Sequence, residues 1–478
     1  MLQNLVSFGP YGQWVASIMA ATCSLISGQL FSWPSAALPK IYSHSAGFDL
    51  SESEAAWMIT ITFAGNIVSS LPSGLLMDKI GRRNTLILSL LVAMVAWLML
   101  AFIPDVTALM IARFLCGIFG GVVYTVVPAF IGEIVDPKIR GSIVALFGAM
   151  MYLGALFESI ASYSSYQGVC LISLIPCVVL FFGFLFLPES PYYYLKKSRR
   201  EDAKKSIIWL KGVCNESDLD QVQAKVEEQL QMKSRFSDLV REKGARRAFI
   251  IVEVLQASQR LSGVTFLFAY TTVVVPDSSW VSAQNSFLVL AIVWFVSSMA
   301  SSSIMDRFNR RTLMAWSCLG SGLAMCAVSV WYYLRDLSTV DTTTTTWFPL
   351  FCLIISGVFY SMGIVSIPTL VQGELFAVNV KSKGSAIACI TANIFSAIGT
   401  RFFYDINNNI GVYFNFTVMG VVPLLDIIFI YLYMIETKGK SLETIQDELH
   451  GKNTVEPAYK RSIPNLAGGS PEKSVTHP

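Results

Sequence analysis

The stretch Met77-Asp78-Lys79-Ile80-Gly81-Arg82-Arg83 lies between two long apolar runs, at roughly 55–76 and 84–103. A similar stretch, Met305-Asp306-Arg307-Phe308-Asn309-Arg310-Arg311, begins close to half of the 478-residue chain further along and again separates two apolar runs. A charged turn repeated at this spacing predicts two homologous halves, each of which places the turn at the same face of a membrane. A single copy could be explained by the general enrichment of Lys and Arg in short cytosolic loops. Two copies in matching places make that explanation weaker.

The composition of the chain indicates a membrane protein. Hydrophobic residues make up 54% of the sequence and charged residues only 14%, whereas soluble domains carry about a quarter. The net charge of +3, with no basic patch interleaved with aromatic residues, argues against nucleic-acid binding. No Cys/His cluster, nucleophile–base pair or phosphate-binding loop is evident. We therefore expect no metal, no cofactor and no enzymatic activity.

Apolar runs close to the length of about 20 residues that spans a bilayer predict an all-α integral membrane protein with twelve transmembrane helices in two sets of six. The runs lie near residues 13–36, 55–76, 84–103, 107–131, 142–165, 168–187, 248–275, 284–304, 312–334, 346–372, 384–406 and 412–434.

The polar stretches divide the chain into four expected parts. Residues 1–187 form the first six-helix half, and residues 248–434 form the second. Between them, residues 188–247 carry helical apolar spacing and predict short amphipathic helices on the cytosolic side; a flexible linker is the alternative. Residues 435–478 are expected to be a mostly disordered cytosolic tail, because Pro, Gly, Ser and Lys dominate its end.

The distribution of Lys and Arg predicts the orientation of the chain. Both charged turns and the 188–247 stretch are basic, whereas the loops on the other side hold little beyond Lys40 and Arg335. By the positive-inside rule, the basic face and both termini are cytosolic. We expect a multi-pass protein of the plasma membrane that works as a monomer in contact with the lipid bilayer.

Several motifs carry a family resemblance. Ser73-Gly74-x-x-x-Asp78-x-x-Gly81-Arg82-Arg83 resembles the loop signature of the major facilitator superfamily. Five further stretches resemble signatures of its sugar porter branch: Arg113-Phe-Leu-Cys-Gly117, Glu133, Arg140-Gly141, Pro188-Glu189-Ser190-Pro191 and the stretch 436–443. The stretch 33–40 is similar to insect facilitated trehalose and hexose transporters in particular. The resemblance implies the major facilitator fold, alternating access, and a polar substrate site near the membrane midplane between the halves.

Charges at helix ends predict a ring of ion pairs on the cytosolic side. Such a ring would hold the halves together while that side is closed and separate when it opens. From the helix-end charges and the resemblance, we assign this gating role to Asp78, Arg82, Arg83, Arg113, Glu133, Arg140, Glu189, Asp306, Arg310, Arg311, Glu374, Lys381 and Glu436.

The substrate positions of sugar porters match this chain only in part. Their Gln-Gln-x-Ser/Thr-Gly-x-Asn motif on span seven is similar to Gln259-Arg260-Leu261-Ser262-Gly263-Val264-Thr265, in which an arginine replaces the second glutamine. The resemblance and the need for polar groups and aromatic faces at a sugar site give the candidate substrate-binding residues Gln259, Arg260, Thr265, Tyr270, Thr369 and Asn393.

Charged residues within predicted spans need partners. We expect Glu158 to pair across the cavity with Arg401 or Arg260. The alternative is that Glu158 and Arg401 lie near the outer interface, with their side chains reaching toward water.

The favoured function is facilitative uniport of a hexose or trehalose-type sugar. Sugar porters driven by protons carry an aspartate on span one where this chain has Gln29, although Glu158 keeps proton coupling open. Two alternatives remain: a sugar sensor that does not transport, and a transporter of another solute such as a polyol or organic anion.

Overall fold

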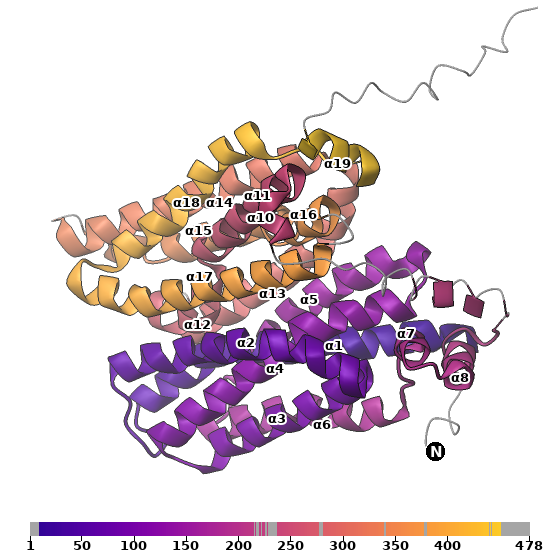
Figure 1. The fold of residues 1–478 in the computed structure, drawn as a ribbon. Coiled ribbons are helices and arrows are strands. Elements are labelled where there is room, and N and C mark those ends of the chain that lie inside the picture. The colour runs from indigo at the N-terminus through magenta and orange to yellow at the C-terminus, as the bar shows by residue number, and fades with distance from the viewer. Residues whose placement is uncertain are drawn as a thin grey trace, which may run out of the picture.

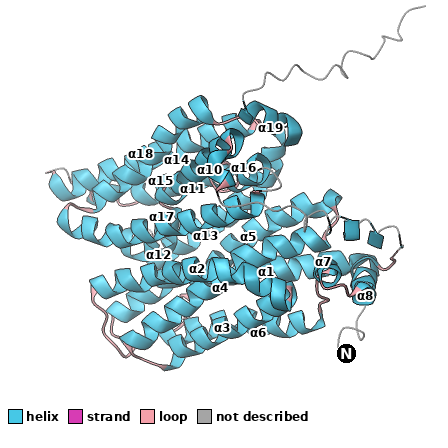
Figure 2. Ribbon diagram, in the orientation of Figure 1, coloured by secondary structure: helices cyan, strands magenta, loops and turns pink. Residues whose placement is uncertain are grey.

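The computed structural model describes residues 9–214, 216, 219–220, 222–224, 227, 237–276, 281–338, 341–376, 380–438, 440 and 442–450. These residues form helices and no strand (Figure 2). The expected disordered end of the chain, residues 451–478, lies outside the described residues.

The first half consists of six membrane-crossing helices, each continuous from one face to the other. They are α1 (Gly12–Tyr42), α2 (Glu52–Ile80), α3 (Arg82–Phe102), α4 (Val106–Ile134), α5 (Pro137–Ala161) and α6 (Tyr166–Phe186). All six are apolar and long enough to cross a bilayer. Figure 1 shows them packed together beside the second half, with α2 and α5 next to α17 and α13.

The second half also crosses six times, but two of its crossings are broken into two helices. Its helices are α11 (Lys243–Leu261), α12 (Val264–Val274), α13 (Ala283–Arg307), α14 (Arg310–Leu337), α15 (Phe348–Met362), α16 (Ile367–Leu375), α17 (Lys381–Asn409) and α18 (Val412–Tyr433), with a short 3-10 helix (Thr343–Thr345) before α15. Eleven candidate spans are found by length and composition among the described residues, and the pair α11–α12 supplies the twelfth crossing. The predicted twelve-helix, two-half architecture is confirmed; the two breaks were not predicted.

Four short helices lie at the end of the bundle that carries the charged turns, which we call the turn face. They are α7 (Pro191–Lys196), α8 (Arg200–Lys211), α10 (Asp238–Arg241) and α19 (Leu442–His450) (Figure 1). Helices at 191–211 and 238–241 agree with the expected helical linker; most of 215–236 lies outside the described residues. Helix α19 is an ordered element at the start of the expected tail: Gln446 donates to the Leu375 carbonyl at 2.7 Å and so docks α19 under the second half.

Close backbone contacts hold the first half together. A Cβ atom added at Gly28 of α1 would overlap the Met151 carbonyl of α5, and one added at Gly154 of α5 would overlap the Leu25 carbonyl of α1. In lipid, where apolar surface gives little drive for helix association, such close packing at small residues is a main source of stability.

Candidate functional site

The charged turn of the first half is closed by a buried ion pair. The Arg82 guanidinium lies 2.8 Å from the Glu133 carboxylate of α4 and 3.5 Å from Asp78. Asp78 also pairs with Lys196 of α7 at 2.9 Å, and the Ser190 hydroxyl donates to the second oxygen of Glu133. The predicted contacts among these residues are present, and all of them lie within the first half.

Glu189 fastens the start of α3 to the end of α6. Its carboxylate accepts backbone N–H groups of Arg82 at 2.8 Å, Arg83 at 3.1 Å and Ser190 at 2.9 Å. Burial raises the pKa of the Glu189 carboxyl, and the hydrogen bonds from these N–H groups oppose the rise. The Arg83 side chain donates to the Phe184 and Leu185 carbonyls, both at 2.7 Å, and so caps the end of α6. Acceptors at the start of α3 and donors at the end of α6 complement the two helix dipoles.

The turn of the second half repeats the backbone part of this arrangement but not the ion pair. Glu436 accepts the N–H groups of Arg310 and Arg311, both at 3.1 Å, as Glu189 does in the first half. Glu374, the counterpart of Glu133, makes no ion pair with Arg310 among the described residues, and its Oε2 is buried without a hydrogen-bond partner. Three other predicted gating side chains, Arg140, Asp306 and Lys381, lie outside the described side chains.

Arg113 was wrongly assigned to the ring at helix ends. It lies two turns inside α4, on the side away from the turn face, and is 1% exposed. Its guanidinium donates to the Leu30 carbonyl of α1 at 2.8 Å and lies over the Trp33 ring, 5.3 Å from the centroid. It therefore joins α4 to α1 inside the first half.

The predicted pairing of Glu158 with Arg401 or Arg260 is also wrong. Glu158 is fully buried and accepts a hydrogen bond from Ser173 of α6 at 2.7 Å, and Arg113 is the cation that acts on it. Arg401 pairs with Asp405, one turn further along α17, at 2.8 Å. Its guanidinium also lies over Trp57 of α2, 5.1 Å from the ring centroid. Each charge has a nearer partner than the one expected.

The two halves are joined at the face opposite the turns. The Ser35 hydroxyl of α1 donates to the Phe268 carbonyl of α12 at 2.8 Å and accepts the Thr271 N–H at 3.1 Å. Gln284 at the start of α13 donates to Ser162 at the end of α5, at 3.1 Å. The contact of Arg401 with Trp57 lies at the same face. At the turn face, the ion pairs of Arg82 with Glu133 and of Asp78 with Lys196 join residues of the first half and the segment that follows it.

Polar side chains from both halves gather around Arg260 at the end of α11. Its positive charge interacts electrostatically with three tyrosine hydroxyl groups, those of Tyr124 of α4, Tyr152 of α5 and Tyr360 of α15. It also acts on Cys389 of α17. Because α4 and α5 belong to one half and the other helices to the second, the group lies between the halves, where the sequence predicted a substrate site.

Gln259 joins the two broken crossings of the second half. Its amide nitrogen donates to the carbonyls of Ile364 and Val365, both at 2.7 Å, in the break between α15 and α16. The Tyr360 hydroxyl donates back to the Gln259 carbonyl at 3.0 Å. The predicted substrate-binding amide thus has its N–H groups bonded within the protein, and its side-chain oxygen is the atom available to a ligand.

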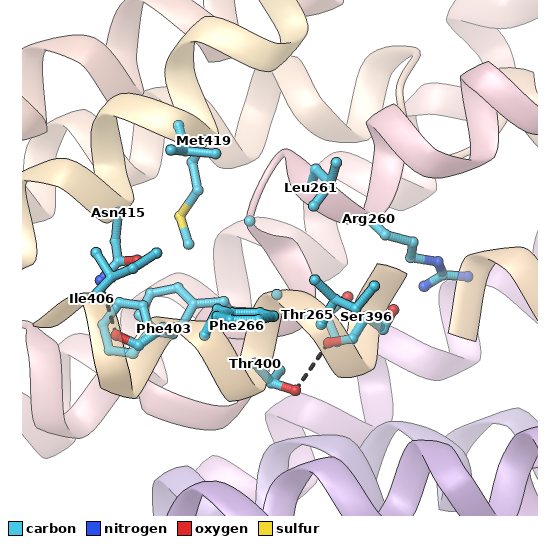
Figure 3. Close-up of a pocket in the computed structure, with 15 residues that line it drawn as sticks. Arg260, Leu261, Thr265, Phe266, Ser396, Thr400, Phe403, Ile406, Asn415 and Met419 are labelled. Carbon is cyan, nitrogen blue, oxygen red and sulfur yellow. Dashed lines mark hydrogen bonds between the residues drawn. The ribbon is translucent and has the colours of Figure 1, made fainter. Parts of the chain in front are cut away.

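Two other predicted substrate residues, Thr265 and Tyr270, lie in or beside a cavity inside the second half. This cavity, of about 230 Å³, is formed by α11, α12, α17 and α18 and lined in part by Thr265, Phe266 and Met419 (Figure 3). Tyr270 stacks behind it on Phe266, with ring centroids 5.3 Å apart. Figure 3 shows the Arg260 guanidinium extending away from this cavity. Arg260 and Thr265 thus line the same cavity, but the guanidinium of Arg260 lies outside it.

Asn393 and Thr369 complete the predicted set. The Asn393 amide donates to the Cys389 carbonyl at 2.8 Å, one turn back along α17, which places it near Arg260. Thr369 is exposed on α16, between the break and the turn face.

The sequence reading missed two acids in crossing helices, and also the three tyrosines. Glu253 of α11 is half-buried beside Thr391 of α17. Asp426 of α18 is 4% exposed and lies 3.9 Å from the Cys318 sulfur. A carboxylate within an apolar run was the available signal for both. The tyrosines gave no such signal, because aromatic residues are common throughout the spans.

Comparisons with known proteins identify relatives along nearly the whole chain. Residues 15–449 match the family described as Sugar (and other) transporter. The chain is 28% identical over 447 residues to "Facilitated trehalose transporter Tret1" of Apis mellifera ligustica, covering 92% of this chain and 88% of that protein. It is 25% identical to the protein of the same name in Drosophila willistoni, of which it spans about half, 51%. The inward open conformation of the xylose transporter XylE from E. coli superposes with a TM-score of 0.74 at 17% identity, over 91% of this chain and 99% of that one.

Proposed function

Since this chain belongs to the Sugar (and other) transporter family and is a sugar transporter of the major facilitator fold, we propose that it works as a facilitative uniporter for a hexose or trehalose-type sugar. We place it in the plasma membrane as a monomer, with the turn face and both termini in the cytosol. The names of the insect relatives, facilitated trehalose transporters, support the substrate class.

The observation that carries the proposal is the set of contacts that join the halves at the face opposite the turns. Ser35, Ser162 and Trp57 connect them there, whereas the ion pair of Arg82 with Glu133 at the turn face lies within the first half. With the turn face in the cytosol, this is the state that admits sugar from inside. The reverse state requires the opposite face to open and the turn face to close, which is alternating access.

A sugar would bind between the halves near Arg260. The Gln259 side-chain oxygen and the Asn393 amide supply polar groups, and the tyrosines around Arg260 supply both hydroxyls and aromatic faces. Uniport is favoured because span one carries Gln29, which is uncharged, at its centre. Glu158 supports proton coupling as the second candidate, since it is fully buried with its Oε1 lacking a hydrogen-bond partner among the described residues.

Uptake of labelled glucose and trehalose into proteoliposomes, with and without a pH gradient, tests this function. We expect saturable uptake that is indifferent to the gradient. The control is Gly148→Trp, because a Cβ at Gly148 meets nothing within 4 Å and the residue lies one turn from Tyr152 toward the turn face of α5. This variant should fold normally and lose uptake. Uptake that follows the gradient would replace uniport with proton coupling, and absence of uptake of both sugars would contradict the proposal.

Ser35→Ala should shift the conformational equilibrium. The change removes the two hydrogen bonds that the Ser35 hydroxyl makes with α12, each with a net contribution of about 0.5–1.5 kcal/mol. It leaves the bond from the Thr272 hydroxyl to the Ser35 carbonyl. The state closed at the opposite face should lose about 1–3 kcal/mol, a shift of roughly 5- to 150-fold in populations. Hydrogen–deuterium exchange of α12 in nanodiscs should accelerate accordingly. Ser24→Ala is the matched control, since Ser24 lies in the same helix with a buried hydroxyl that has no partner among the described residues. Equal exchange in both variants would show that Ser35 does not hold this face closed.

A further inference from the structure

Three arginines lie inside membrane crossings, away from both ends of the crossing, and one of them differs from the others in its partners. Arg113 is bonded to the Leu30 carbonyl, lies over Trp33 and is near Glu158. Arg401 pairs with Asp405. Arg260 makes no ion pair with a carboxylate among the described residues, and its Nε is buried without a hydrogen-bond partner. A cation inside a membrane protein normally pairs with an anion. Because Arg260 has no such partner among the described residues, a bound ligand is a candidate for its anion.

The surroundings of Arg260 are suited to an anion. Its charge acts on the hydroxyls of Tyr124, Tyr152 and Tyr360, which come from three helices and both halves. Tyr124 donates to a methionine sulfur, a weak acceptor, at 3.2 Å, so its hydroxyl is readily exchanged for a better partner. The Tyr360 hydroxyl already donates to the Gln259 carbonyl. The donors for the oxygens of one carboxylate are therefore the Arg260 guanidinium and the Tyr124 hydroxyl.

The nearest acid on the same helix does not neutralise Arg260. Glu253 lies seven residues earlier on the same face of α11, about 10 Å along the axis, and its carboxylate faces Thr391 of α17. It lies toward the turn face and not beside the guanidinium. The charge of Arg260 is therefore available to a ligand between the halves.

We infer that the preferred solute of this protein is a hexose-type sugar bearing a single carboxylate, a hexuronate, whose carboxylate binds Arg260. The inference rests on the transport function proposed above. A planar guanidinium binds a carboxylate through two parallel hydrogen bonds. A sugar phosphate, with about two negative charges, would need a second cation, and the other two arginines inside the crossings already have their own partners. The sugar hydroxyls would donate to the Gln259 and Asn393 side-chain oxygens.

The test compares two sugars that differ only at the sixth carbon. Uptake of labelled D-glucuronate and D-glucose is measured at pH 7.4 in proteoliposomes of the full-length protein, where glucuronate is ionised. The wild type should prefer glucuronate, and Arg260→Gln should lower the glucuronate-to-glucose ratio of kcat/KM at least tenfold. Arg260→Lys, which retains the charge, should preserve most of the preference. Arg401→Gln is the matched control, because Arg401 lies at the opposite face and pairs within α17, so the ratio should not change.

A binding measurement separates failure of this inference from failure of transport. Glucuronate should raise the melting temperature of the purified wild type and not that of Arg260→Gln. Glucose uptake without glucuronate uptake, competition or thermal shift would overturn the carboxylate inference and leave sugar transport standing. A thermal shift by glucuronate that depends on Arg260, without uptake of either sugar, would support the carboxylate site and overturn transport. A ratio that is the same in the wild type and Arg260→Gln would overturn the role of Arg260.

Discussion

Replacing Gly81 by alanine adds only one methyl group, yet we expect it to cause one of the largest losses of stability of any glycine-to-alanine change in this protein. Gly81 has φ +100° and ψ 165°, a conformation almost restricted to glycine, and a Cβ there would overlap Oε2 of Glu189. The backbone strain costs about 1–3 kcal/mol. Displacing Glu189 would leave the N–H groups of Arg82, Arg83 and Ser190 unpaired, which costs about 1–3 kcal/mol more.

The melting temperature of the purified protein in detergent measures this effect. Gly74→Ala is the matched control, because Gly74 lies within the same α2 helix and a Cβ there meets nothing within 4 Å. Alanine at that position should be neutral or stabilise by up to about 1 kcal/mol, since it favours helix more than glycine does. Equal melting temperatures for the two variants would show that the turn tolerates a side chain and that Glu189 is free to move.

Replacing Arg82 by alanine should cost about 3–5 kcal/mol, because it removes one partner of a buried ion pair and leaves the other charged. Arg82 is 7% exposed and lies 2.8 Å from Glu133. After the change, Glu133 would retain only the Ser190 hydroxyl among the contacts described for it. Chemical denaturation monitored by intrinsic tryptophan fluorescence would report the loss. Arg82→Lys should fall in between, since lysine retains the charge but not the two-nitrogen contact.

The equivalent residue of the second half provides the comparison. Arg310 donates to the Met305 carbonyl and makes no ion pair with Glu374 among the described residues. Arg310→Ala should therefore cost about 0.5–1.5 kcal/mol, the net value of an ordinary hydrogen bond. Similar losses for Arg82→Ala and Arg310→Ala would contradict the asymmetry between the two turns.

The sequence predicted what depends on local patterns. Hydropathy alone determines twelve crossings, and the repeated turn around Asp78 and Asp306 relates the two halves, because both signals lie within short windows. Glu189 and Glu436 were also found, since each follows the last helix of its half. The roles of these residues could be read from their positions next to a helix end.

Contacts between distant segments could not be read in this way. Arg113 bonds to a carbonyl 83 residues earlier, and no spacing in the sequence identifies that partner. Glu158 was assigned to arginines across the cavity because charge was the only criterion, whereas the folded chain supplies Ser173 on the adjacent helix α6. The arrangement of the predicted substrate residues could not be read either, because α11 breaks at Gly263. Arg260 and Thr265 line one cavity from either side of the break, and the Arg260 guanidinium extends away from it.

The breaks at Gly263 and at 363–366 occur in the second half only, whereas α1 to α6 are each uninterrupted. A continuous helix resists bending along its whole length, and a broken one bends at the interruption. The second half therefore has two breaks at which it can bend, and α1 to α6 have no such break. Gln259 links the two points of compliance, so that they deform together. For spectroscopy, the first half is the fixed reference frame: dyes attached there define coordinates in which the displacement of α12 and α16 during turnover can be measured.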